Sequence, residues 1–284
     1  MAISFGPGGN SESWGKRKFP EQLPEYLASM GLNGYEIDCG RGVRLSEKTP
    51  TLLPGLAQQN GIYVTLHAPY FISLASKEPE KRENSVRYIL ESAAAVQKLG
   101  GDRIVVHPGG LGGLPRADAT ALAMETLKKA QAALDENGLS AVHICPEVMG
   151  KINQLGTLSE VLQMCSLDER MLPCVDFGHL NSREHGALQD SAAFAAVLDE
   201  IERRLGSVRV KQFHIHFSKI EYTAGGEKKH LTFADTVFGP EPAPLMALLA
   251  ERGLTPTVIC ESDGTQTADA ATMRKEYEAA RQNM

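Results

Sequence analysis

Short apolar runs alternate with longer mixed stretches along the whole chain. The apolar runs have the length of buried strands, and eight strands are predicted: 2–6, 34–39, 62–67, 103–107, 141–148, 172–177, 210–217 and 257–262. Each run is followed by a segment that is predicted to be a helix: 20–30, 50–59, 78–99, 117–136, 158–165, 190–205, 243–251 and 268–281. The stretch 78–99 is amphipathic and ends at Gly100-Gly101, and a long polar loop is expected after residue 217.

This order of elements predicts one α/β domain over residues 1–284. Near-continuous β-branched runs such as Ile104-Val105-Val106 are typical of a parallel sheet that is covered on both faces. No Pro-rich or Ser-rich linker divides the chain, and its length is usual for a (β/α)8 TIM barrel. An open doubly wound sheet is the rival, but the chain has no GxGxxG after its first strand and no GxxxxGK[ST]. We therefore predict a single TIM barrel.

Side chains that can bind metals stand at the ends of the predicted strands. The set is His67, His107, Glu147, Asp176 with His179, His214 and Glu261, and the loop after the seventh strand adds Glu227 and His230. Active sites of TIM barrels gather at the carboxyl ends of the strands, so these groups are expected to converge. Carboxylates brought together would repel one another unless cations compensate them. Mixed His, Asp and Glu ligands suit zinc or manganese better than magnesium or calcium, and their number predicts two or three ions.

Other polar side chains on the same strands are expected to have supporting roles. His143 is expected either in the core or behind the ligands, and His185 in solvent. His216 shares a face with His214 and could contact the ligands from behind, as could Glu36 and Asp38 on the second strand.

Composition narrows the class of protein. Hydrophobic residues make up 42% and charged residues 23%, as in ordinary globular proteins. The chain shows no signal peptide and no run of about 18 apolar residues, so we expect a cytoplasmic protein without membrane contact. The five cysteines lack a CxxC pair, which favours a reducing compartment: Cys39, Cys145, Cys165, Cys174 and Cys260. A net charge of −6 argues mildly against nucleic-acid binding through bulk charge, although a local basic surface remains open.

The motifs around these residues resemble the endonuclease IV family of apurinic/apyrimidinic endonucleases, within the xylose-isomerase-like barrels. The matching segments run from the third to the eighth predicted strand: Leu66–Ala75, Val106–Gly109, Pro146-Glu147, Asp176–His179, His214–Lys219 and Cys260-Glu261. The resemblance implies a zinc-dependent hydrolase of DNA repair. Such an enzyme cleaves DNA 5′ to abasic sites through a metal-bound hydroxide.

The resemblance also implies which residues hold which ion. The groups are His67, His107 and Glu147 for the first ion; Glu147, Asp176, His214 and Glu261 for the second; and His179 with His230 for the third. Glu147 would bridge the first two ions, and Glu147 and Glu261 would have catalytic roles. Whether Glu227 also binds the third ion stays open, because the family has a shorter acid and a closer spacing there.

Two segments depart from the family pattern. Ser4–Gly9 replaces a His-containing motif, and the loop Cys39–Arg44 is short where the family carries residues that enter the duplex. Basic residues are expected around the mouth of the barrel, where they could bind phosphates or be ordinary solvated charges: Lys16-Arg17-Lys18, Arg41, Arg44, Lys151, Lys219 and Lys228-Lys229.

Two other functions compete with a nuclease. Sugar isomerases or epimerases on related barrels resemble the chain at Glu147, Asp176, His214 and Glu261, which is enough for one metal ion. A non-catalytic binding protein is the third candidate, and the intact ligand set argues against it. We expect a monomer that acts on abasic DNA.

Overall fold

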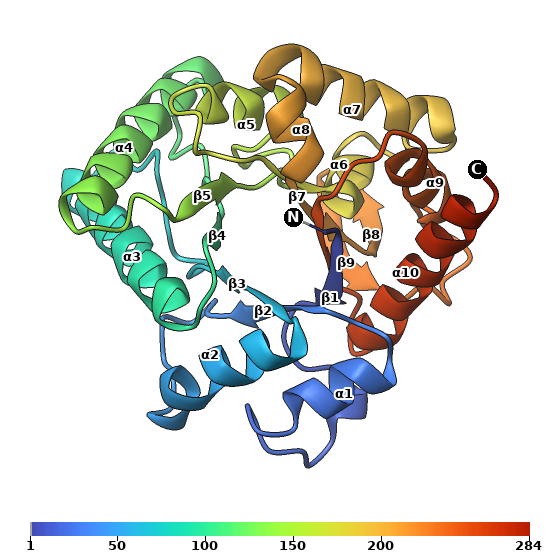
Figure 1. Ribbon diagram of the computed structural model, residues 1–284. Helices are drawn as coiled ribbons and strands as arrows, with labels where there is room; N and C mark the ends of the chain where they lie inside the picture. The colour runs from blue at the N-terminus through green and yellow to red at the C-terminus, as the bar shows by residue number, and fades with distance from the viewer. Residues whose placement is uncertain (1) are drawn as a thin grey trace.

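Eight parallel strands line the inside of the molecule in the computed structural model, which describes residues 2–284 (Figure 1). They are β1 (Ser4–Pro7), β2 (Gly34–Asp38), β3 (Tyr63–His67), β4 (Arg103–Val106), β5 (His143–Pro146), β6 (Cys174–Asp176), β7 (His214–Phe217) and β10 (Thr257–Cys260). Two four-stranded sheets, β1-β10-β7-β6 and β2-β3-β4-β5, are joined by the bridges Gly8–Glu36 and Glu147–Cys174. The strands therefore close into a ring, and the predicted TIM barrel is confirmed.

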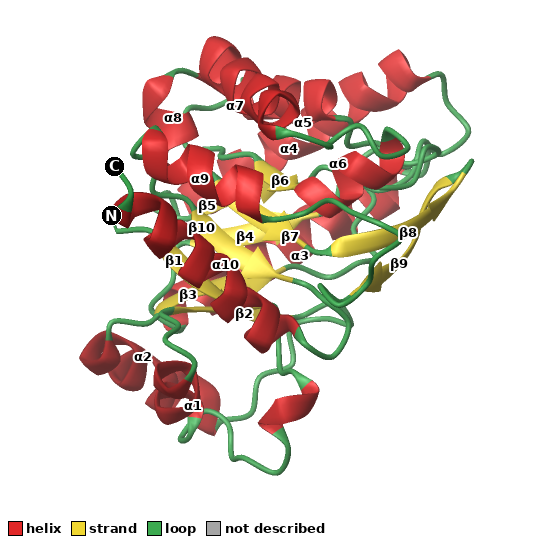
Figure 2. Ribbon diagram, turned by 90° about the vertical axis from the view of Figure 1, so that its right-hand side faces the viewer, coloured by secondary structure: helices red, strands yellow, loops and turns green. Residues whose placement is uncertain are grey.

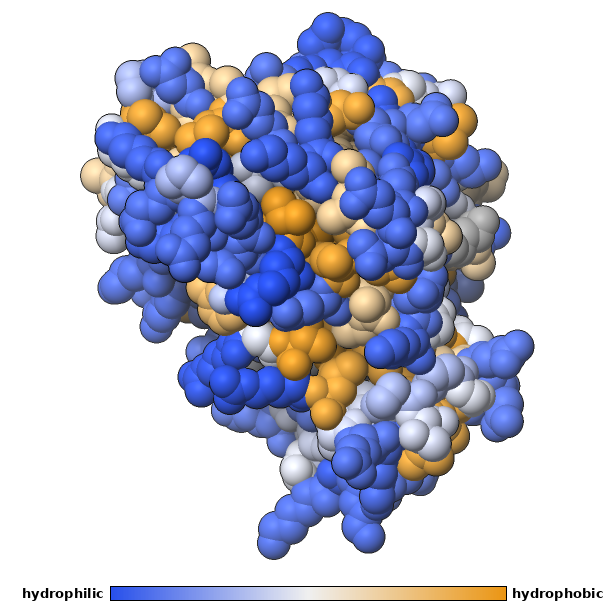
Figure 3. Space-filling model, turned by 90° about the vertical axis from the view of Figure 1, so that its left-hand side faces the viewer, coloured by the Kyte–Doolittle hydropathy of each residue, from blue (hydrophilic) through white to orange (hydrophobic). Residues whose placement is uncertain are grey.

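Helices surround this ring (Figure 1). They are α1 (Leu23–Ser29), α2 (Lys48–Asn60), α3 (Pro79–Lys98), α4 (Arg116–Glu136), α5 (Leu158–Cys165), α6 (Phe177–Arg183), α7 (Ser191–Leu205), α8 (Ser207–Gln212), α9 (Ala243–Glu251) and α10 (Gln266–Gln282). Hydrophilic side chains cover most of the side that carries α3, with apolar side chains in a strip across its middle (Figure 3). In the described part of the chain, no helix combines the length and the apolar character needed to cross a membrane.

The structure differs from the predicted elements between residues 207 and 231. The predicted strand 210–217 begins only at His214, because α8 occupies the preceding residues. In α8, Val208 is 70% exposed whereas Val210 is buried, so these β-branched residues do not form a buried strand. The predicted polar loop contains a hairpin of β8 (Lys219–Thr223) and β9 (Gly226–Leu231), which projects beyond the carboxyl ends of the barrel strands (Figure 2).

The barrel interior is divided into an apolar and a polar layer. Val105, Cys145, Leu172 and Cys174 form a small buried cluster that is separate from the main core. The two cysteines are thus core residues, and all five cysteines are free and buried. The polar side chains of the predicted site continue from this cluster toward the carboxyl ends of the strands, so the barrel presents one functional face.

Candidate metal centre

The carboxyl ends of six strands and the hairpin bring nine metal-competent side chains together. These are His67, His107, Glu147, Asp176, His179, His216, Glu227, His230 and Glu261. Three groups account for all nine, and within each group the potential ligand atoms lie within 4.8 Å of one another. Two further sets that meet the same distance overlap them: His67 with His216 and Glu261, and, deeper in the barrel, Cys174 with His214 and His216. A cleft of about 670 Å³ opens over the groups. The strand ends therefore build one continuous site.

The first group lies at the ends of β3, β4 and β5. Glu147 Oε2 is 3.4 Å from His67 Nε2 and 2.9 Å from His107 Nε2. His67 Nδ1 is 2.8 Å from the Ala68 carbonyl oxygen, which keeps Nε2 turned toward the carboxylate. The ring of Tyr70 stacks on His107 with 5.2 Å between centroids, so it covers this group on the cleft side.

The second group shares Glu147 with the first. Glu147 Oε1 is 3.0 Å from His216 Nδ1, which in turn is 3.3 Å from Glu261 Oε2. Asp176 completes the group; its Oδ1 accepts a hydrogen bond from the backbone N–H of His179, which leaves Oδ2 directed into the site. The two oxygens of Glu147 thus face different groups, which is the arrangement that a bridging carboxylate needs.

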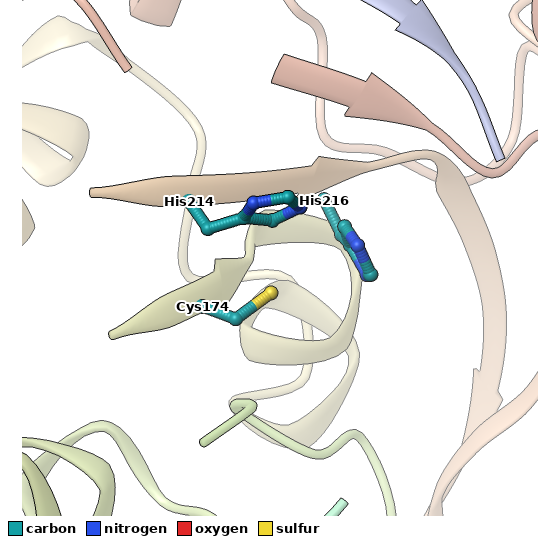
Figure 4. A group of neighbouring side chains, drawn as sticks. All are labelled: Cys174, His214 and His216. Atoms are coloured by element: carbon teal, nitrogen blue, oxygen red, sulfur yellow. The ribbon is translucent and has the colours of Figure 1, made fainter. Parts of the chain in front are cut away.

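The structure places His216, and not the predicted His214, in the second group. Both side chains point into the barrel because alternate residues of a strand share a face (Figure 4). His214 lies one layer deeper, paired in register with Cys174, whereas His216 is paired with Asp176. The Nε2 atom of His214 is 3.2 Å from Glu36 Oε2. The other ligands that the barrel strands supply lie at the last residue of their strand or directly after it. In the run that ends at Phe217, His216 is nearer to this position than His214, which is the signal that the sequence offered.

The third group joins α6 to the hairpin. His179 Nε2 is 3.5 Å from Glu227 Oε2, and the His179 and His230 rings lie 5.3 Å apart. His179 Nδ1 contacts the Val148 carbonyl at 3.0 Å and His230 Nδ1 contacts Ser218 Oγ at 2.9 Å, so each Nε2 is left for the site. The structure therefore adds Glu227, the position that the sequence left open.

A bulge explains how Glu227 and His230 reach the same group. In a regular strand, residues three apart point to opposite faces. Tyr222 pairs with Glu227 and Glu221 pairs with Lys229, so Lys228 is an extra residue on β9. A bulge of this kind shifts the alternation by one residue. Glu227 and His230 consequently face the site together.

The charges of the cluster strongly affect one another. Burial opposes protonation of His67, but contact with Glu147 raises its pKa to about 9. In the same way Asp176 and Glu147 outweigh burial and raise the pKa of His179 to about 10. Burial raises the pKa of Asp176 to about 6. In the absence of cations, the raised pKa values of His67 and His179 keep protons on these two imidazoles beside the carboxylates at neutral pH.

The donor set fits divalent cations. Glu147 Oε2 and Asp176 Oδ2 are buried and accept no well-aligned hydrogen bond among the described residues, although imidazole nitrogens lie close to them, His107 Nε2 at 2.9 Å and His179 Nδ1 at 3.3 Å. Leaving a buried polar atom without a partner costs about 1–3 kcal/mol, and more for a charged group. A cation between these oxygens and the imidazoles would remove that cost, and imidazole with carboxylate is a donor set that suits zinc or manganese.

The remaining polar residues divide between the cleft and the body of the barrel. Lys151, Lys228 and Lys229 line the cleft, as expected of a basic rim. Lys219 was expected there but is 3% exposed, and its Nζ donates to Glu241 Oε1 at 2.6 Å. His143 contacts the Arg170 carbonyl oxygen at 2.6 Å, at the opposite end of β5 from the site. These two side chains are therefore structural.

Similar sequences include both an uncharacterized protein and nucleases. An uncharacterized protein of Methanocaldococcus jannaschii is 31% identical over 84% of this chain and 85% of its own length. A probable endonuclease 4 of Shouchella clausii is 28% identical over 76% of this chain and 75% of its own.

Solved structures with the same fold have two kinds of activity in their names. A D-tagatose 3-epimerase-like protein superposes with a TM-score of 0.75 at 18% identity, covering 99% of both chains. Endonuclease IV from Thermus thermophilus superposes with a TM-score of 0.68 at 18% identity, covering 100% of both. The family model described as xylose isomerase-like TIM barrel matches residues 24–283. The chain belongs to the xylose isomerase-like TIM barrel family.

Proposed function

We propose that this chain is a zinc-dependent phosphodiesterase of the endonuclease IV type, which cleaves DNA 5′ to abasic sites in DNA repair. The observation that carries the proposal is the third group, His179, Glu227 and His230, beside two groups that already share Glu147. The group of Glu147, Asp176, His216 and Glu261 suffices for one ion, which could serve a sugar isomerase or epimerase, whereas a phosphodiester that loses its leaving oxygen benefits from charge on both sides of phosphorus. Similarity to probable endonuclease 4 proteins supports the same reaction.

Three zinc ions are the proposed complement, with manganese as a substitute. His67, His107 and Glu147 would hold the first ion, and Glu147 would be shared with the second. Ions held there supply Lewis acidity to a phosphate and lower the pKa of water. Glu147 is completely buried, so its part is to hold two ions at a fixed separation.

Glu261 is the carboxylate through which the second group meets the substrate. Its side chain is 20% exposed and lines the cleft, whereas Asp176 and His216 are fully buried. Contact with His216 outweighs burial and lowers the pKa of Glu261 to about 2, so the carboxylate is ionised at neutral pH. Glu261 Oε2 can therefore accept a hydrogen bond from an attacking water and orient it toward phosphorus.

The cleft has the charges that a nucleic-acid backbone requires on one wall. Lys151 and the pair Lys228 and Lys229 lie beside the third group. Lys228 Nζ is 2.6 Å and Lys229 Nζ 3.7 Å from the carboxylate of Glu221, so these two lysines would exchange this partner for phosphates that flank the cleaved bond. Asp38 and Asp263 line the same cleft and can accept hydrogen bonds from sugar hydroxyls. The short loop after β2 leaves recognition of the duplex to other parts of the mouth.

The second candidate is a metal-dependent sugar isomerase or epimerase. The group Glu147, Asp176, His216 and Glu261 is complete without the other two and could bind one ion with a sugar. Asp38 and Asp263 in the cleft also favour hydroxyl-bearing substrates. This reading leaves the third group without a role.

Cleavage of a defined oligonucleotide separates the two candidates. Zinc-loaded protein is incubated with a duplex that carries one tetrahydrofuran abasic analogue, with the matching intact duplex, and with a panel of ketoses. The proposal predicts incision 5′ to the analogue and no change in the sugars. Conversion of a ketose without incision of any duplex would favour the epimerase.

A further inference from the structure

A buried carboxylate lies directly behind the imidazole of the second group. Glu36 is on β2, it is 1% exposed, and its Oε1 is 2.9 Å from His216 Nε2. Its other oxygen, Oε2, accepts a hydrogen bond from Thr65 Oγ1 at 2.8 Å. Thr65 on β3 thus holds Glu36 in place, and Glu36 in turn contacts His216 on β7.

His214 completes the surroundings of this carboxylate. Its Nε2 is 3.2 Å from Glu36 Oε2, and the His214 and His216 rings are 5.0 Å apart. Figure 4 shows the two imidazoles next to each other on β7, with Cys174 beside them on β6. His214 therefore contacts Glu36 from the apolar floor of the barrel and fixes its carboxylate on that side.

The contact with Glu36 decides which nitrogen of His216 is free. A neutral imidazole has its proton on one ring nitrogen and a lone pair on the other. A carboxylate at Nε2 favours the proton on Nε2, which leaves the Nδ1 lone pair directed toward Glu147 and Glu261.

His67 and His230 are held in the opposite sense. In both, Nδ1 contacts a carbonyl or a hydroxyl oxygen, so Nε2 faces the ligand groups. His179 Nδ1 contacts the Val148 carbonyl oxygen and Asp176 Oδ2, while its Nε2 faces Glu227. His216 must present Nδ1 instead, which requires a partner at Nε2. Glu36 is that partner.

We infer that Glu36 is a positioning residue: it fixes the tautomer and the ring orientation of His216, and Thr65 and His214 hold Glu36 in place. The inference rests on the metal centre of the proposed function but is independent of the substrate. Partners behind a ligating histidine typically change metal affinity by about 10- to 100-fold.

The test measures metal affinity in matched variants of the full chain. Zinc-loaded Glu36→Gln is titrated with a chelator of known affinity, and the metal left on the protein is counted. Glu160→Gln is the control, because Glu160 is also a buried glutamate but pairs with Arg116 outside the barrel. Glu36→Gln is expected to bind one ion about 10- to 100-fold more weakly, with the other ions and the control unchanged.

Thr65→Val keeps the test decisive if Glu36→Gln does not fold. It removes one hydroxyl and is expected to weaken the same ion by a smaller factor, whereas Thr126→Val, at an equally buried site, leaves all ions bound. Long-range ¹H–¹⁵N spectra of the loaded protein add a direct signature: His216 should have its proton on Nε2.

Two outcomes overturn the inference. One is unchanged zinc affinity in both Glu36→Gln and Thr65→Val, and the other is a protonated Nδ1 of His216 in the loaded protein. If wild-type protein itself binds no ion at His216, the proposed function fails as well, so the two failures are distinguishable.

Discussion

His214 and His216 are chemically identical, and only their depth along β7 separates their roles. His216 faces Glu147 and Glu261, whereas His214 faces Glu36 below them. His216→Gln should therefore lose the ion of the second group, because an amide replaces the ligating imidazole. His214→Gln should keep every ion, since His214 lies outside the second group and contacts the oxygen of Glu36 that Thr65 also holds. Metal analysis after gel filtration checks both variants; loss of an ion from His214→Gln alone would reverse the assignment.

Protons occupy the site when cations do not, and this predicts a pH dependence of metal binding. The pKa values of His67 and His179 are raised to about 9 and about 10, so both are protonated at pH 7.5 in the metal-free protein. Zinc must displace these protons, and its apparent affinity should rise as the pH increases toward 9. Calorimetry at pH 7.5 in buffers of different ionisation enthalpy should detect net proton release. Binding without any release would contradict the assignment of these two ligands.

At the scale of elements, the bulge in β9 is the feature that joins the hairpin to the barrel. Deleting Lys228 should restore regular alternation and turn either Glu227 or His230 away from His179. The deletion is expected to lose the third ion and to keep the first two. Lys228→Ala, which retains the bulge, is the matched control and should bind all three. Metal counting of the two variants checks this, and a deletion that retains three ions would show that the bulge is dispensable.

The hairpin of β8 and β9 could not be predicted from the sequence. Apolar runs predicted the barrel strands well, because strands of a parallel sheet are covered on both faces and are therefore mostly apolar. The hairpin has no such run: its residues Glu227-Lys228-Lys229-His230 are polar and half exposed, and the bulge in β9 interrupts their alternation. Glu227 could not be assigned to a group until its pairing with Tyr222 was known.

At the scale of the whole molecule, the barrel was predicted from the sequence, and most of the predicted site residues lie together because strand ends converge in this architecture. Depth inside the barrel was harder to predict, since it depends on register between neighbouring strands. His214 illustrates this: it has the right face but lies opposite Cys174 instead of Asp176. The roles of Glu36 and Thr65 also depend on contacts between β2, β3 and β7 that no local pattern encodes.

The overall charge of −6 and the basic rim of the cleft affect a nucleic acid over different distances. The whole molecule repels a polyanion at long range, while Lys151, Lys228 and Lys229 attract it only within about 8–10 Å at ordinary salt. Recognition of DNA by this chain would accordingly depend on local contacts at the mouth of the barrel and on the ions beneath them.

The central claim is that the shared carboxylate of Glu147 supports phosphodiester hydrolysis at an abasic site. Single-turnover incision of the tetrahydrofuran duplex by zinc-loaded wild-type protein and by Glu147→Gln tests it most directly. We predict a single cut 5′ to the analogue that leaves a 3′-hydroxyl. The rate should be at least about 100-fold lower in Glu147→Gln, because this variant loses a metal ligand itself and not only a residue that supports a ligand. Equal rates in the two proteins, or no incision by fully loaded wild type, would contradict the account.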